Sequence, residues 1–120
     1  MEFNDNKAIY LQITDLFCDE ILEKKWSDGD RIPSVREMAV NIEVNPNTVM
    51  RTYSYLQEKG IIYNKRGIGY FLTDDAYQTT LKLRKEEFIE QELPNIFKTI
   101  SLLDIDFKDL EGLYKAYVSE

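Results

Sequence analysis

The stretch that most constrains the fold is 45–69, which begins with strong helix-start residues and ends in a glycine-bearing turn. Asparagine at position 45 is suited to cap a helix, and Pro46 is suited to the first helical position. The helix is predicted to run to about Lys59, because Gly60 can take the left-handed conformation that ends a helix. A short polar helix of this kind must pack its Val49-containing face on other elements.

A tight β-hairpin is predicted directly after this helix. Two short runs rich in aromatic and β-branched residues, 61–63 and 70–72, flank a basic, glycine-bearing turn at 64–69. A polar helix beside a basic hairpin is typical of an element that enters a nucleic-acid groove while its neighbour touches the backbone.

Two further helices are predicted before this stretch. An apolar stripe of Ile9, Ile13, Leu16, Phe17 and Ile21 indicates a first helix over 7–25, with Cys18 as a packed small hydrophobe. Ser34 and Glu37 have capping-box spacing, and they predict a second helix over 34–41. Joined to the third helix by 43–45, it forms a helix-turn-helix unit. The fold class is therefore mainly α with a small β-hairpin, a winged helix-turn-helix.

The C-terminal segment is predicted to be helical again from Thr73, with Pro94 kinking or breaking the pattern and Asp106 capping a final helix. We expect two domains, a winged DNA-binding domain over 1–73 and a helical tail over 74–120. Two amphipathic helices of this size need a partner surface. Pairing with the same element of a second subunit is the favoured solution, and folding back on the winged domain is the alternative.

Several function classes are disfavoured by composition. The chain has no histidine and one cysteine, which leaves no zinc site, no histidine-based triad and no internal disulfide. A carboxylate-only metal site stays open, but no cofactor and no enzymatic activity are expected. We also expect a cytoplasmic protein without membrane contact, since no run of about 18 apolar residues and no signal-peptide pattern are present.

Charge is unevenly distributed along the chain. The net charge is −7, yet residues 31–72 carry six basic and three acidic side chains, a net charge of +3. Because the local field steers a polyanion toward a surface, the basic segment can face DNA while the acidic remainder repels it. Chance clustering in an acidic protein is the alternative on charge alone.

Five motifs in register resemble the GntR family of bacterial transcription regulators, over residues 8–72. They are Y-x-Q-I at 10–13, G-D-R-I-P-S-V-R-E-M-A at 29–39, N-P-N-T-V-M-R-T-Y at 45–53, L-Q-E-K-G-I-I at 56–62 and R-G-I-G-Y-F at 66–71. The short tail resembles the small YtrA-type branch. The resemblance implies a DNA-binding regulator without a large effector domain, and it implies a transporter operon as a possible target.

The candidate DNA-binding residues follow from position and resemblance together. Arg36 matches the DNA-contacting arginine of the family's second helix. Asn47 and Thr48 match the polar pair that starts the recognition helix, and their backbone N–H groups are expected to be free for phosphate or base edges. Arg51 can read a guanine edge or bind only phosphate. The wing contributes four candidate residues: Lys65 and Arg66 are suited to contact a phosphate or the minor groove, and Gly67 and Gly69 match the family's wing glycines.

The family commonly has a basic residue where this chain has Pro46, and an arginine where it has Met50.

Taken together, the motifs and the predicted elements indicate a homodimeric transcription regulator, more readily a repressor than an activator, that binds double-stranded DNA at an inverted-repeat operator. The alternative is a winged-helix protein-interaction module that does not bind DNA. No small-molecule effector is indicated by the residues.

Overall fold

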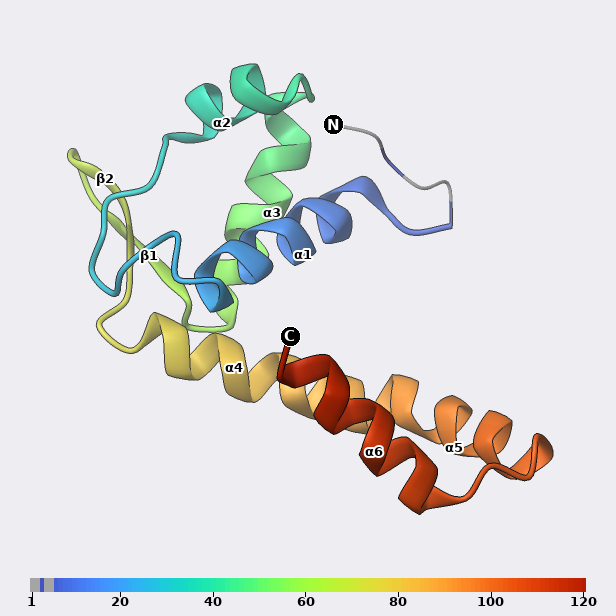
Figure 1. The fold of residues 1–120 in the computed structure, drawn as a ribbon. Coiled ribbons are helices and arrows are strands. Elements are labelled where there is room, and N and C mark those ends of the chain that lie inside the picture. The colour runs from blue at the N-terminus through green and yellow to red at the C-terminus, as the bar shows by residue number, and fades with distance from the viewer. Residues whose placement is uncertain (1–2, 4–5) are drawn as a thin grey trace. The chain divides into compact units, whose positions relative to one another are not determined.

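The protein is described by a computed structural model over residue 3 and residues 6–120. It is mostly helical, with one two-stranded antiparallel sheet (Figure 1). The chain forms two compact units, which we call the winged unit, up to Leu83, and the tail unit, from Arg84 to Glu120. The expected functional boundary near residue 73 stays a prediction. Within the described residues, no helix is both long enough and apolar enough to cross a membrane.

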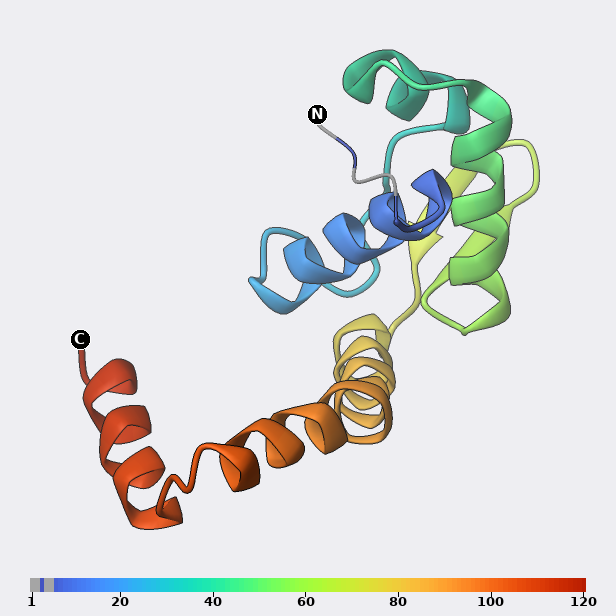
Figure 2. The same cartoon turned by 90° about the vertical axis from the view of Figure 1, so that its right-hand side faces the viewer.

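Three helices form the body of the winged unit: α1 (Ile9–Leu22), α2 (Val35–Ile42) and α3 (Pro46–Glu58). Both α1 and α2 pack on α3 (Figure 2). All three begin and end within three residues of the predicted positions. The capping box is confirmed, since the Glu37 N–H donates to Ser34 Oγ and the Ser34 N–H donates to Glu37 Oε1, each over 3.1 Å. Glu43 ends α2 in the left-handed conformation, with φ of 56°.

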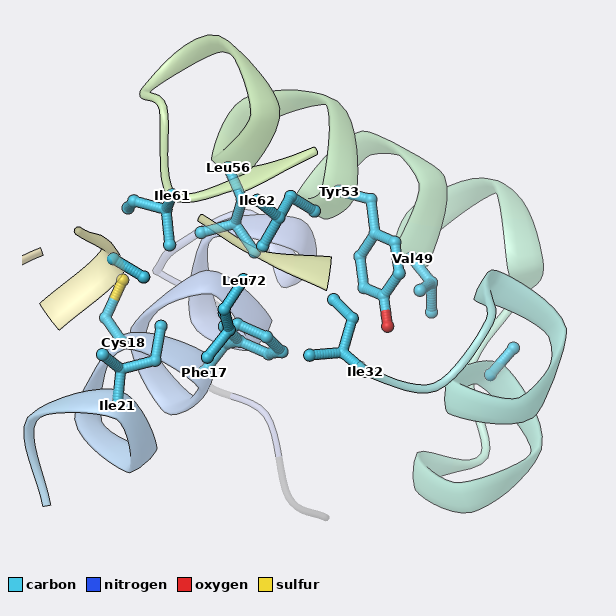
Figure 3. Packing of buried hydrophobic residues seen from close by; sticks show 12 residues of the cluster. Phe17, Cys18, Ile21, Ile32, Val49, Tyr53, Leu56, Ile61, Ile62 and Leu72 are labelled. Carbon is cyan, nitrogen blue, oxygen red and sulfur yellow. The ribbon is translucent and has the colours of Figure 1, made fainter. Parts of the chain in front are cut away.

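The core of the winged unit lies between α1, α3 and the hairpin. The buried face of α3 consists of Val49, Tyr53 and Leu56, as predicted, together with Thr52. Figure 3 shows Val49, Tyr53 and Leu56 converging with side chains of α1 and of the strands. The buried apolar core residues are Ile13, Phe17, Cys18, Ile21, Ile32, Ala39, Val49, Tyr53, Leu56, Ile61, Ile62, Leu72 and Ala76.

The predicted apolar stripe of α1 is wrong at two of its five positions. Ile9 and Leu16 are 43% and 38% exposed, while Thr14 is buried. The buried face is centred on Phe17 and Ile21 and is rotated toward Thr14, so Ile9 and Leu16 fall at its edge. Thr14 is accommodated because its hydroxyl donates to the Tyr10 carbonyl oxygen over 2.7 Å.

The hairpin consists of β1 (Ile62–Lys65) and β2 (Gly69–Leu72), paired antiparallel with Ile62 opposite Leu72. Its turn is shorter than predicted, since the strands extend to Lys65 and resume at Gly69. The sequence also missed a third extended segment, in which Arg31 bridges to Phe71. There the Ile32 N–H donates to Tyr70 O over 3.0 Å, and the Leu72 N–H donates to Asp30 O over 2.8 Å. These bonds anchor the hairpin to the chain before α2.

Helix α4 (Ala76–Glu87) begins inside the winged unit. Ala76 is part of its core, and the Tyr77 N–H donates to the carboxylate of Asp28 over 2.9 Å. A side chain from the loop after α1 therefore caps this helix.

The helical chain continues through a π-helical turn, η1 (Phe88–Glu92), into α5 (Leu93–Leu102). Pro94 interrupts the α-helical pattern but does not end the helical chain. Proline lacks an N–H, and in a regular α-helix its ring would clash with a carbonyl one turn earlier. The wider π-helical turn, in which the Leu93 N–H donates to Phe88 O, lies directly before Pro94. Helix α6 (Phe107–Val118) follows, with Asp106 as its cap, as predicted: the Lys108 N–H donates to Asp106 Oδ1 over 3.1 Å.

The tail unit has no core of its own. Among residues 84–120, all of which the structure describes, none is buried. Figure 2 shows α5 and α6 diverging from the turn that joins them. Its large exposed apolar side chains are Phe88, Ile89, Ile96, Phe97, Leu102, Leu103, Ile105, Phe107, Leu113, Tyr114, Tyr117 and Val118.

Candidate nucleic-acid interface

The N-cap residue Asn45 fixes the start of α3 through two hydrogen bonds. The Asn45 side chain accepts from the Asn47 N–H over 2.8 Å, and the Asn45 carbonyl accepts from the Thr48 N–H over 2.9 Å. The expectation that both N–H groups are free is therefore wrong, because the cap residue satisfies them locally. Asn47 and Thr48 retain their side chains as recognition groups, with Asn47 exposed and Thr48 partly buried.

The face of α3 opposite the core is exposed, and near its start it carries both polar and apolar side chains. Asn47, Met50, Arg51 and Ser54 lie on it, and no acidic residue occupies the first turn. The acidic side chain of α3, Glu58, comes at the far end of the helix. The first two turns are therefore the part that a polyanion can approach without meeting an acid from this helix.

Arg51 is held against α1. Its guanidinium carbon lies 4.1 Å from the centre of the Tyr10 ring, a cation–π contact. The Tyr10 carbonyl oxygen accepts from the hydroxyls of Thr14 and Thr52, each over 2.7 Å, which ties this turn of α1 to α3. Sequence reasoning missed Tyr10 as a partner of Arg51. The aromatic residue in the Y-x-Q-I motif was a signal that the sequence offered. The contact could still not be predicted, because the sequence does not show how α1 crosses α3.

Arg36 is exposed on α2 and borders an open hollow of about 450 Å³. The other residues that line the hollow are apolar: Ala39, Val40, Val44 and Pro46. The hollow brings α2 and the first residue of α3 to one surface, so Arg36 lies beside the start of the recognition helix, which begins ten positions later in the sequence.

The wing tip presents Lys65 and Arg66 to solvent. The Ile68 N–H donates to Lys65 O over 2.9 Å and closes the turn, with Gly67 at φ of 79°. Gly69 has φ of 143°, and a Cβ there would lie 3.2 Å from Arg31 Nε. Both glycines thus have a conformational reason to be glycine, one that requires no contact with DNA.

Two groups in this region have shifted pKa values. Hydrogen bonds from the Ser34 backbone and side chain lower the pKa of Glu37, which keeps the capping box charged. Burial raises the pKa of Tyr53, whose hydroxyl donates to the Pro33 carbonyl oxygen over 2.7 Å. Both groups hold the start of α2 in place.

The candidate residues gather at one end of the winged unit. Figures 1 and 2 both place α2, the start of α3 and the hairpin tip at the end away from the start of α4. The three elements that carry Arg36, Asn47 and Arg66 therefore reach the same side of the unit.

Comparison with known proteins agrees with this architecture. Residues 9–72 match the family described as bacterial regulatory proteins, gntR family. The chain belongs to this family. It is a DNA-binding transcription regulator and not an enzyme.

Individual relatives of this gntR-family regulator match over nearly its full length. The uncharacterized regulator YhcF of Bacillus subtilis is 45% identical over 113 residues, covering 93% of this chain and 92% of YhcF. The repressor YtrA of Bacillus subtilis is 39% identical over 107 residues, covering 89% and 82%. A crystal structure of a putative GntR-family regulator from Bacteroides thetaiotaomicron has a TM-score of 0.78 at 46% identity, covering 93% of this chain and 97% of that one.

Proposed function

We propose that this gntR-family regulator is a homodimeric repressor that binds an inverted-repeat operator. Each subunit contributes one copy of the surface formed by α2, the start of α3 and the wing. The DNA-contacting residues are Arg36, Asn47, Thr48, Arg51, Lys65 and Arg66, with Gly67 and Gly69 shaping the wing tip. Two such surfaces related by a two-fold axis require half-sites about one helical turn, roughly 34 Å, apart.

The absence of any buried residue in the tail unit is the observation that carries the dimer. Phe107, Leu113 and Tyr117, which span nearly three turns of α6, are 69%, 68% and 75% exposed. Apolar surface of this extent gains free energy when it is removed from water, and monomers rarely leave such patches open. A second copy offers the same patch in self-complementary form, and two-fold pairing is the commonest oligomer.

The elements of the winged unit have distinct proposed roles. The start of α3 enters the major groove with Asn47 and Thr48, while Arg36 approaches from α2. Arg51 binds a phosphate instead of a guanine edge, because its guanidinium is held against the Tyr10 ring of α1. Lys65 and Arg66 contact the backbone or minor groove at the wing tip.

The sign of regulation and the target rest on different support. Repression is supported by the relative YtrA, which is named a repressor. A reporter fused to the selected operator tests the sign of regulation. Control of a transporter operon rests on the resemblance to the YtrA-type branch alone, and the genes that follow the selected operator in the native genome test it.

Arg36→Ala tests the reading surface. An operator is first selected from random duplexes with the full-length protein, and affinity is then measured by fluorescence anisotropy at matched salt. We expect Arg36→Ala to weaken binding by about 1–3 kcal/mol, and wild-type affinity to fall with salt at a slope near −0.9 per neutralised phosphate.

Lys82→Ala is the matched control, because it removes one exposed positive charge from α4, outside the proposed surface. Equal affinity of Arg36→Ala and wild type contradicts the role of Arg36. Salt-independent binding, or a monomer by light scattering at micromolar concentration, contradicts the dimeric DNA-reading mechanism.

A further inference from the structure

The exposed front of the recognition helix carries apolar side chains at its start. Pro46 is exposed, and Met50 is 44% exposed. These two residues are four apart, so they lie one turn above each other on the same side of α3. Asn47 lies beside them on the exposed face.

The apolar character extends onto α2. Val40 is 76% exposed and lines the hollow that also contains Pro46 and Val44. Arg36 is the charged residue at the edge of that hollow. The first turn of α3 contains no acidic residue. Exposed apolar side chains beside an arginine proposed to contact DNA suit a partner that has apolar groups within an anionic surface.

The major groove of DNA has one such apolar group on its base edges, the C5-methyl of thymine. A guanine edge offers two acceptors and calls for a charged donor such as arginine or lysine, which Pro46 and Met50 are not. Adenine, the partner of thymine, is read by an asparagine side chain through N6 and N7. The Asn47 side-chain amide is exposed, and its backbone N–H is already bonded to Asn45.

We propose that Pro46 and Met50 contact thymine C5-methyl groups and that Asn47 reads adenine beside them, so each half-site contains A·T pairs under the start of α3. This inference rests on the proposed function, since it requires a specific operator. The start of the recognition helix thereby selects A·T pairs, while Arg36 and the wing supply the charged contacts.

The test removes single methyl groups from the DNA. In the operator selected with the full-length protein, each thymidine is replaced in turn by deoxyuridine, which keeps the hydrogen-bonding edge and lacks only the methyl. We expect one or two thymidines per half-site at which the wild-type protein binds roughly fourfold more weakly, the factor that corresponds to burying one CH₂-sized group.

Protein variants then assign the contact through a double-mutant cycle. At the thymidine that Met50 contacts, Met50→Ala is expected to bind the thymidine and deoxyuridine operators with equal affinity. Pro46→Ala is expected to do the same at the thymidine that Pro46 contacts. Met50→Leu retains an apolar contact and should retain the methyl sensitivity. Ser54→Ala, one turn further along the same exposed face, should also leave it unchanged.

The outcomes separate this inference from the proposed function. A selected operator at which no thymidine is sensitive to methyl removal overturns the methyl reading alone. So does a sensitivity that persists undiminished in both Met50→Ala and Pro46→Ala. Failure to select any operator overturns the proposed function as well, and with it the methyl reading.

Discussion

The winged unit and the tail unit contain similar apolar side chains but place them differently. In the winged unit, Leu56, Tyr53 and Ile62 are at most 1% exposed, and three helices and a hairpin share one core. In the tail unit, side chains as large as Tyr114 and Phe107 are more than 60% exposed. An apolar stripe therefore stabilises the chain only where a second element covers it. The first unit supplies its own cover, and we propose that the second obtains it from another subunit.

The largest expected contrast is in stability. Leu56→Ala should lower the free energy of unfolding of the winged unit by about 2–5 kcal/mol, because it leaves a cavity in a closed core. Leu113→Ala, the same change at a side chain that is 68% exposed, should shift that transition by less than about 1 kcal/mol. Urea unfolding followed by the fluorescence of Trp26, which packs on Phe17, measures both. Similar losses in the two variants would erase the distinction.

Self-association is expected to show the reverse dependence. Leu113→Asp should weaken dimerisation at least tenfold, about 1.4 kcal/mol, because a charge would be buried in the proposed interface. Gln57→Asp adds the same charge at an exposed site of α3 and serves as the control. Sedimentation equilibrium over a concentration series compares the two. If Leu113→Asp associates as wild type does, the tail unit is not the interface.

Alkaline pH is expected to destabilise the winged unit through Tyr53. Burial raises the pKa of Tyr53 in the folded state above the value of about 10 that tyrosine has in an unfolded chain. The neutral hydroxyl thus contributes stability that is complete below pH 10 and is lost as pH rises beyond it.

Tyr53→Phe provides the corresponding measurement. At neutral pH the variant should lose about 1–3 kcal/mol, because the Pro33 carbonyl oxygen loses its 2.7 Å donor. Its urea midpoint should decline less than that of wild type between pH 9.5 and pH 11. Parallel declines in the two proteins would show that Tyr53 does not govern the alkaline transition.

The smallest expected effect concerns the contact between α1 and the recognition helix. Tyr10→Leu should weaken operator binding by about 0.5–1 kcal/mol, since the Arg51 guanidinium loses the ring that orients it. Tyr10→Phe keeps the ring, and the carbonyl bonds to Thr14 and Thr52 involve backbone, so it should bind as wild type does. If the two variants bind alike, the ring does not position Arg51.

Much of the fold was predictable because its signals are local. The caps at Ser34, Asn45 and Asp106 formed as predicted, since each bonds to an N–H two or three residues away. The buried face of α3 followed from its period. The same local chemistry explains one error: Asn45 satisfies the N–H of Asn47 that was expected to be free.

The remaining errors concern contacts between segments distant in sequence. Arg31 pairs with Phe71 across 40 positions, and no pattern in 30–32 marked it as a strand. Ile9 and Leu16 matched the helical period of α1, but which part of a wide apolar stripe is buried depends on how α1 crosses α3. The contact between Tyr10 and Arg51 depends on the same crossing.

The order of elements, the helix starts, the winged architecture and the family could all be predicted from the amino-acid sequence. These follow from backbone propensities, caps and periodicities that act within a few residues. Three features became evident only in the folded chain: the pairing of 30–32 with β2, the contact of Arg51 with Tyr10, and the lack of any buried residue in 84–120. Such features depend on the packing of whole elements, where side chains far apart in the chain compete for the same contact surface.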